Sequence, residues 1–133
     1  MTDKPTPLLA LSAVAYFVAS LSVIFAGDEL LDLAGAAGTL LEVALLQLLG
    51  AAIFSLGMLN WLNRYSRIGG IFGRPLVVAN FANSAISALM LIHLIRRAGV
   101  SAALAVPLGF YALLALAFGA RLFLPARETD DWK

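Results

Sequence analysis

Long apolar stretches alternate with shorter polar ones along the whole chain. The apolar stretches cover about residues 7–26, 39–61, 75–95 and 102–124. An α-helix needs about 20 apolar residues to cross a hydrocarbon core about 30 Å thick, so each stretch is long enough to span a membrane. The pattern predicts an all-α integral membrane protein with four membrane-spanning helices.

Residues typical of helix starts stand near the beginnings of these stretches. Thr6 provides a hydroxyl N-cap and is followed by Pro7, which has no N–H to leave unpaired in a first turn. Thr39 and Glu42 have the spacing of a capping box, in which each side chain binds the other residue's backbone N–H. Pro107 lies within the first two turns of the fourth stretch, so it either kinks that helix or marks its true beginning.

The connection between the first two stretches, residues 27–38, is acidic. It holds Asp28, Glu29 and Asp32, interleaved with leucines, and no basic residue. This mixture of leucines and acids favours a short helix lying in the membrane interface. All three connections are short, which favours an up-down-up-down four-helix bundle that forms a single membrane domain over residues 1–133.

Small residues recur at helical spacing within the stretches. Gly50 and Gly57 lie seven residues apart on one face of the second predicted helix, and Gly109 and Gly119 each follow an alanine by four residues. In lipid, such small residues let helix backbones approach closely, because packing rather than the hydrophobic effect drives association there. These faces are predicted contacts between helices.

Composition supports a membrane protein and excludes several classes of function. Apolar residues make up 62% of the chain and charged residues 13%, against roughly 45–50% and about 25% in soluble domains. The chain has no cysteine, which excludes disulfides, thiolate metal sites and thiol redox chemistry. The net charge is +1, so no general field attracts nucleic acid.

The basic residues are distributed unevenly between the two sides of the predicted bundle. The side that holds the N-terminus, the second connection and the C-terminal tail carries seven of the nine lysines and arginines: Lys4, Arg64, Arg67, Arg74, Arg121, Arg127 and Lys133. The other side carries Arg96 and Arg97. Cytoplasmic segments hold the excess of basic residues, so both termini are predicted to be cytoplasmic, with anionic lipid headgroups as partners at that face.

A polar stripe runs along the third predicted helix. Asn80, Asn83, Ser84 and Ser87 follow 0, 3, 4, 7 spacing, which places them on one face. Unpaired amides are expensive in lipid, so this face must contact other helices or a wet cavity. Two interpretations stay open: hydrogen bonds that hold the bundle together, or a polar pocket that Gln47 and two tyrosines would join from neighbouring helices.

Two ionisable side chains lie well inside the apolar stretches, both near the predicted outer face. They are Glu42 on the second helix and His93 on the third. Intramembrane ionisable groups are functional candidates, and a carboxylate beside an imidazole could relay a proton. The structural alternative is the capping box for Glu42 and a place near the basic helix end for His93. A single histidine without cysteine is a poor metal or haem signature, so no metal and no cofactor is predicted.

The predicted cytoplasmic connection, residues 60–74, is rich in arginine, aromatic residues and glycine. Trp61, Arg64, Arg67 and Arg74 are candidate contacts for lipid headgroups or a partner, although topological anchoring alone also accounts for them. The glycines lack the Lys-Ser/Thr that follows in a phosphate-binding loop. No catalytic triad, paired-carboxylate site or zinc-protease motif occurs in the chain, so no catalytic residue and no enzymatic activity are predicted.

A motif spreads over the second to fourth predicted helices and consists of Gly50-Ala51, Leu56-Gly57, Asn60-Trp61-Leu62-Asn63-Arg64, Asn80 and Phe118-Gly119. It resembles the Gly-Ala…Gly-x-x-x-Trp-Leu-x-Arg pattern of an uncharacterised family of small bacterial four-span integral membrane proteins. The resemblance implies a bacterial inner membrane as the location and implies no particular activity.

Three functions are compatible with these features. The leading hypothesis is a non-enzymatic accessory or interaction protein, which packs against a second copy of itself or against another membrane protein. The alternative is a binder or transporter of a small or lipidic molecule that uses the polar stripe. The third hypothesis is an ion or proton pathway formed in an oligomer.

Overall fold

The computed structural model of the chain describes residues 6–36, 38–66, 71 and 73–124. Over those residues the protein is all-helical, with five helices and no strand. The helices are α1 (Pro7–Phe25), α2 (Gly27–Leu33), α3 (Leu40–Leu62), α4 (Gly73–Ala98) and α5 (Ala102–Phe123). By length and composition α1, α3, α4 and α5 are each able to cross a membrane, which confirms the prediction of four long apolar helices.

The polar residues before α1 and α3 act in different ways. The capping box predicted at the start of α3 is present: Glu42 N–H donates to Thr39 Oγ1 at 3.3 Å, and Thr39 N–H donates to Glu42 Oε2 at 2.8 Å. The hydroxyl cap predicted for α1 was wrong, because the Thr6 side chain makes no capping bond. The Thr6 hydroxyl donates instead to the Ser66 carbonyl at 3.1 Å, and its N–H donates to the Arg64 carbonyl at 2.6 Å. Thr6 therefore joins the start of α1 to the end of α3.

Two further local predictions concern the acidic connection and the proline of the last helix. The connection between α1 and α3 contains the expected short helix, α2, with Asp28 and Glu29 in its first turn. Acidic side chains there complement the positive end of the helix dipole. Pro107 lies inside α5, which begins at Ala102, so this proline does not mark the helix start. Its missing N–H removes one backbone hydrogen bond from the second turn.

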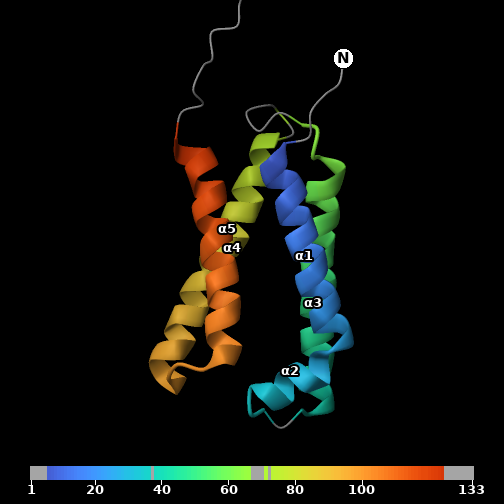
Figure 1. Cartoon of the computed structure of the whole chain (residues 1–133), viewed down its shortest axis with the longest axis vertical. Helices are drawn as coiled ribbons and strands as arrows, with labels where there is room; N and C mark the ends of the chain where they lie inside the picture. Colours follow the sequence, from blue (N-terminus) through green and yellow to red (C-terminus); the bar gives the residue numbers. More distant parts are fainter. Residues whose placement is uncertain (1–5, 37, 67–70, 72, 125–133) are drawn as a thin grey trace, which may run out of the picture.

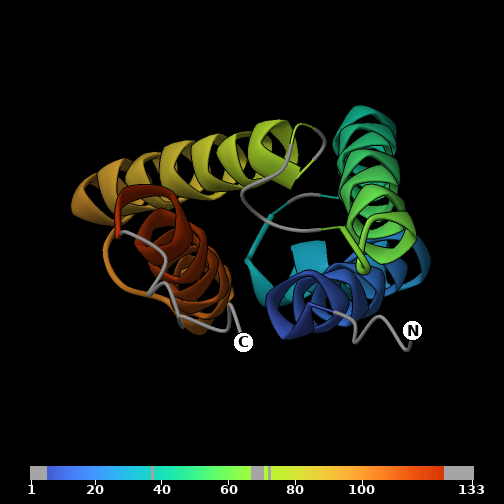
Figure 2. The ribbon, with the colours of Figure 1, turned by 90° about the horizontal axis from the view of Figure 1, so that it is seen from above.

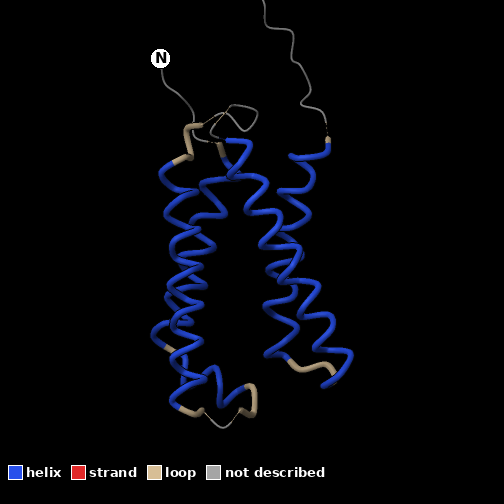
Figure 3. Tube along the Cα trace, turned by 180° about the vertical axis from the view of Figure 1, so that it is seen from behind, coloured by secondary structure: helices blue, strands red, loops and turns tan. Residues whose placement is uncertain are grey.

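The four long helices are arranged as two pairs. α1 packs along α3, and α4 packs along α5 (Figures 1 and 2). The pairs meet near the connection between α3 and α4 and lie farther apart near α2 (Figures 1 and 3). Contacts between the pairs run from α1 to α5 and from α3 to α4, and they are sparser than the contacts within each pair.

Two glycines bring α3 close to α1. A Cβ on Gly50 would lie 2.6 Å from Cγ1 of Ile24, and a Cβ on Gly57 would lie 3.0 Å from the ring of Phe17. Both distances are shorter than ordinary van der Waals contact, so only the absence of a side chain permits this spacing. The α1–α3 contact therefore uses the glycine face that the sequence pattern predicts.

The α4–α5 pair uses only one of the two glycines in α5. A Cβ on Gly119 would lie 3.0 Å from the ring of Phe81 in α4. A Cβ on Gly109 would meet nothing within 4 Å among the described atoms, so this position faces away from the other helices. The prediction of a close helix contact thus applies to Gly119 and not to Gly109.

A hydrophobic cluster joins all four long helices. Its buried members are Leu9 and Tyr16 from α1, Ile53 from α3, Leu76 and Val77 from α4, and Leu114 and Phe118 from α5. The ring of Tyr16 also meets Phe110 of α5 edge-on, with the centroids 5.9 Å apart. This packing sets the polar stripe of α4 against α1 and α3.

Candidate functional site

Two buried asparagines form a reciprocal amide pair where the helix pairs meet. Asn60 Nδ2 of α3 donates to Asn80 Oδ1 of α4 at 3.0 Å, and Asn80 Nδ2 donates to Asn60 Oδ1 at 2.8 Å. Asn60 Nδ2 also donates to Ser12 Oγ of α1 at 2.9 Å. Both asparagine side chains have an exposure of 0%. We call Ser12, Asn60 and Asn80 the polar junction, since they link three of the four long helices.

The donors of the polar junction are all used within the protein. Asn80 Nδ2 makes its second hydrogen bond to the Leu76 carbonyl at 2.8 Å, and Ser12 Oγ donates to the Leu9 carbonyl at 3.1 Å. An amide without partners costs several kcal/mol in an apolar environment, which the complete network avoids. No donor of this network is left for a ligand, so its geometry suits helix packing.

A second polar group lies one turn farther along α4 and is less complete. The hydroxyl groups of Tyr16 and Ser84 are 3.5 Å apart, and Asn83 lies beside the same tyrosine hydroxyl. Ser87 lies beside the Tyr111 hydroxyl of α5. Among the described residues, Asn83 Nδ2 is buried and forms no hydrogen bond of good geometry. This unpaired donor is the one feature of the polar stripe that helix packing leaves unexplained.

The predicted stripe faces the other helices, whereas Gln47 does not join it. Asn80 and Ser84 are buried, and Asn83 and Ser87 are half-buried. Gln47 is exposed on the surface of α3. The inward position in that turn belongs to the neighbouring residue, Leu46, whose side chain lies near α2. The predicted convergence of Gln47 with the stripe therefore does not occur within this chain.

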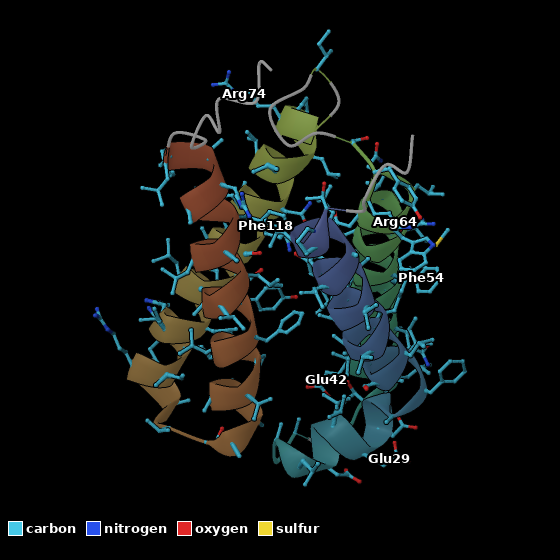
Figure 4. All side chains as sticks on the ribbon, turned by 45° about the horizontal axis from the view of Figure 1, so that its top comes forward. Glu29, Glu42, Phe54, Arg64, Arg74 and Phe118 are labelled. Carbon is cyan, nitrogen blue, oxygen red and sulfur yellow. The ribbon has the colours of Figure 1, made fainter. Side chains whose placement is uncertain are left out.

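Glu42 and His93 are not brought together. The Glu42 carboxylate accepts hydrogen bonds from both the N–H and the hydroxyl of Thr39, at 2.8 and 2.9 Å, at the end of α3 nearest to α2 (Figure 4). His93 is exposed on α4. Over residues 6–36, 38–66, 71 and 73–124, no three acidic or histidine side chains lie close enough to hold a metal ion. The geometry gives Glu42 a helix-capping role.

Local contacts at the end of α3 hold the Arg64 side chain. The Arg64 guanidinium lies 4.2 Å from the centroid of the Trp61 ring and 4.5 Å from that of Tyr65, and its Nη1 donates to the Trp61 carbonyl at 2.7 Å. A cation there complements the negative end of the helix dipole. Arg74 is exposed at the start of α4 (Figure 4), and Arg67 lies outside the described residues.

Two members of the polar junction were not predicted as site residues. Asn60 stands where the predicted second helix, residues 39–61, overlaps the predicted connection, residues 60–74, and in the structure it lies within α3 and is fully buried. Its spacing of three residues after Gly57 continues the glycine face, so the same periodicity would have identified it. Ser12 lies four residues before Tyr16, on the buried face of α1. Both residues could have been found by extending each packing face toward its helix end.

Comparisons with known proteins assign no family and no function to this chain. The motif resemblance to small bacterial four-span proteins accordingly stays a prediction. No protein-family model, no curated protein and no solved structure gives a significant match to the chain.

Proposed function

We propose that this protein is a non-enzymatic accessory protein of a bacterial inner membrane, which acts by packing against a second copy of itself or another membrane protein. The polar junction supports this proposal. Catalysis and ligand binding require side chains with free donors or acceptors, yet the donors of Ser12, Asn60 and Asn80 are all used, some in bonds between helices and some in bonds to a carbonyl of their own helix. The three residues of the polar junction thus stabilise the packing of the helices.

The outward surface of the helices is where such a protein would act. Between 17% and 28% of the apolar window of each long helix is buried within the chain, with α3 at the low end. The rest of each window is at least partly accessible to lipid or to other membrane helices. In lipid, helices associate through close packing and interhelical hydrogen bonds, so outward small or polar residues determine where a partner binds.

We infer an up-down-up-down path through the membrane with both termini in the cytoplasm. Arg64 stacks on Trp61 at the end of α3, and Arg74 follows at the start of α4. Arg96 and Arg97 lie in the last turn of α4. On this path the side predicted to hold seven of the nine lysines and arginines would face the cytoplasmic lipid headgroups, where each arginine gains about 1 kcal/mol.

Native mass spectrometry of the protein in mild detergent tests the proposed function. We expect the mass of a homo-oligomer or of a complex with another protein, and no retained small molecule. Asn80→Ala should leave those masses unchanged, because the hydrogen bonds of this side chain all lie within its own chain. A retained small molecule that disappears in Asn80→Ala would contradict the proposal.

A second candidate function rests on Asn83. Its buried, unpaired Nδ2 could donate to a carbonyl or phosphate oxygen of a small or lipidic molecule bound beside Tyr16. In that case native mass spectrometry would show a bound molecule that Asn83→Leu releases and Asn63→Leu retains. Asn63 is a suitable control because its amide donates to Leu59 at the end of its own helix.

A further inference from the structure

Gln47 presents an amide to the surroundings of α3 near the middle of the helix. Asn60, Asn80 and Asn83 are buried or half-buried, whereas the Gln47 side chain is exposed. Gln47 is four residues from Ala51, the midpoint of Leu40–Leu62, which is about 6 Å along the axis. No described residue forms a hydrogen bond with the Gln47 amide. An isolated chain in a membrane would thus expose this amide to hydrocarbon.

The Gln47 amide needs a hydrogen-bonding partner, because its exposure to hydrocarbon is unfavourable. Moving an amide from water to hydrocarbon without a hydrogen bond is strongly unfavourable. Gln47 lies seven residues from the start of α3 at Leu40, about 10 Å along the axis, which is beyond the reach of its short side chain. Another membrane helix that supplies both a donor and an acceptor would remove this cost.

The residues around Gln47 permit a second helix to approach closely. Ala44, Gln47, Ala51 and Ser55 share one exposed face of α3, at spacings of three and four residues. We call these four residues the Gln47 face. The Ser55 hydroxyl donates to the Ala51 carbonyl at 3.0 Å, so it needs no outside partner. A polar group flanked by small residues is the arrangement that lets membrane helices pack and hydrogen-bond.

We propose that the Gln47 face is the contact between two copies of this chain, packed α3 against α3 around a two-fold axis along the membrane normal. This proposal rests on the proposed function, since it names the partner of an interaction protein. In this parallel arrangement both copies have the same orientation in the membrane, so the two Gln47 side chains lie at the same depth. A two-fold axis brings each residue of the face to its own equivalent. The two carboxamides then form a reciprocal pair, as Asn60 and Asn80 do within the chain.

The polarity of the face favours a second copy over a different partner. A carboxamide both donates and accepts, so it is its own complement. The Gln47 face carries no charged side chain that would repel an identical face. A partner of different sequence would need an amide or hydroxyl at the same depth, whereas the second copy supplies it automatically.

Cysteine cross-linking in liposomes tests the proposal directly, because the natural chain contains no cysteine. Ala51→Cys should give a disulfide-linked dimer under mild oxidation. Leu49→Cys, exposed on the opposite side of α3, should stay monomeric. Gln47→Leu should lower the dimer association constant about tenfold or more, and Leu49→Ala should leave it unchanged. Circular dichroism shows whether each variant keeps its helices.

The possible outcomes separate this proposal from the proposed function. A monomeric protein without an Ala51→Cys cross-link overturns the dimer. A cross-link from Ala51→Cys to a different membrane protein also overturns the dimer, yet it supports an interaction protein. A bound small molecule lost in Asn80→Ala overturns the proposed function, whatever the cross-linking shows.

Discussion

The carboxamide group occurs in three situations on the long helices. Asn60 and Asn80 saturate one another, Asn83 keeps a buried nitrogen without a described partner, and Gln47 points outward. An amide removed from water must find a hydrogen bond, so the same chemical group can direct packing within the chain, contact with a bound molecule, or contact between chains. Which role applies depends on the face of the helix and not on the residue type.

A double-mutant cycle can measure the energetic coupling between Asn60 and Asn80. Asn60→Ala and Asn80→Ala should each lower the free energy of unfolding by about 1–3 kcal/mol, because each change leaves a buried amide without its partner. The double variant should lose less than the sum of the two, by roughly 0.5–3 kcal/mol. Denaturation in mixed micelles measures these values.

Asn63→Ala is the matched control for this cycle. Its amide donates to the Leu59 carbonyl at the exposed end of α3 and reaches no other helix. We expect a change of no more than about 0.5 kcal/mol. Fully additive losses for Asn60→Ala and Asn80→Ala would contradict a direct bond between them.

At the scale of the helices, close packing occurs where a glycine leaves no side chain between two helices. α3 approaches α1 most closely at Gly50 and Gly57, and α5 approaches α4 at Gly119. Close approach increases dispersion contacts along the whole helix, which is the main attraction between helices in lipid. The two pairs are therefore tightly packed internally, while hydrogen bonds and a shared hydrophobic cluster connect them to each other.

An added methyl group distinguishes a packed glycine from an open one. Gly50→Ala should lower the free energy of unfolding by about 1–3 kcal/mol, because its Cβ would lie 2.6 Å from Ile24 Cγ1. Gly109→Ala should be neutral or stabilising by up to about 1 kcal/mol, since its Cβ would meet nothing within 4 Å. Equal effects on thermal unfolding in detergent would show that Gly50 is not at a close contact.

At the scale of the whole molecule, charge and packing divide the protein into two ends. The end where the helix pairs meet carries the stacked Arg64 and Trp61, the polar junction and the start of α4. The other end carries acidic α2 and the basic last turn of α4. Seven of the nine lysines and arginines are predicted on the side of the junction end, so this is the expected cytoplasmic end.

Reporter fusions test this orientation. A fluorescent protein that folds only in the cytoplasm should be fluorescent when fused after Lys133. Alkaline phosphatase, active only in the periplasm, should be active when inserted after Gly99 and inactive after Lys133. Phosphatase activity at the C-terminus would reverse the proposed topology.

Features set by local sequence were predictable, and features set by neighbours were not. The four long helices and the Thr39–Glu42 capping box follow from hydrophobic length and from residues three positions apart. The polar stripe was correctly placed on one face, but no pattern told which of Asn80 and Asn83 would find a partner. That outcome depends on Asn60, which α3 brings to Asn80 from twenty residues away.

The hydrogen bonds of Thr6 bear on the order in which the protein is assembled during synthesis. Its N–H and hydroxyl close the α1–α3 pair through Arg64 and Ser66, so every partner in this closure is made before α4. Chains emerge from the ribosome N-terminus first and fold in that order. The pair of α1 and α3 can thus form before α4 has been made. The bond from Asn60 to Ser12 lies within this pair, and Asn60 gains Asn80 as a further partner only once α4 has been made.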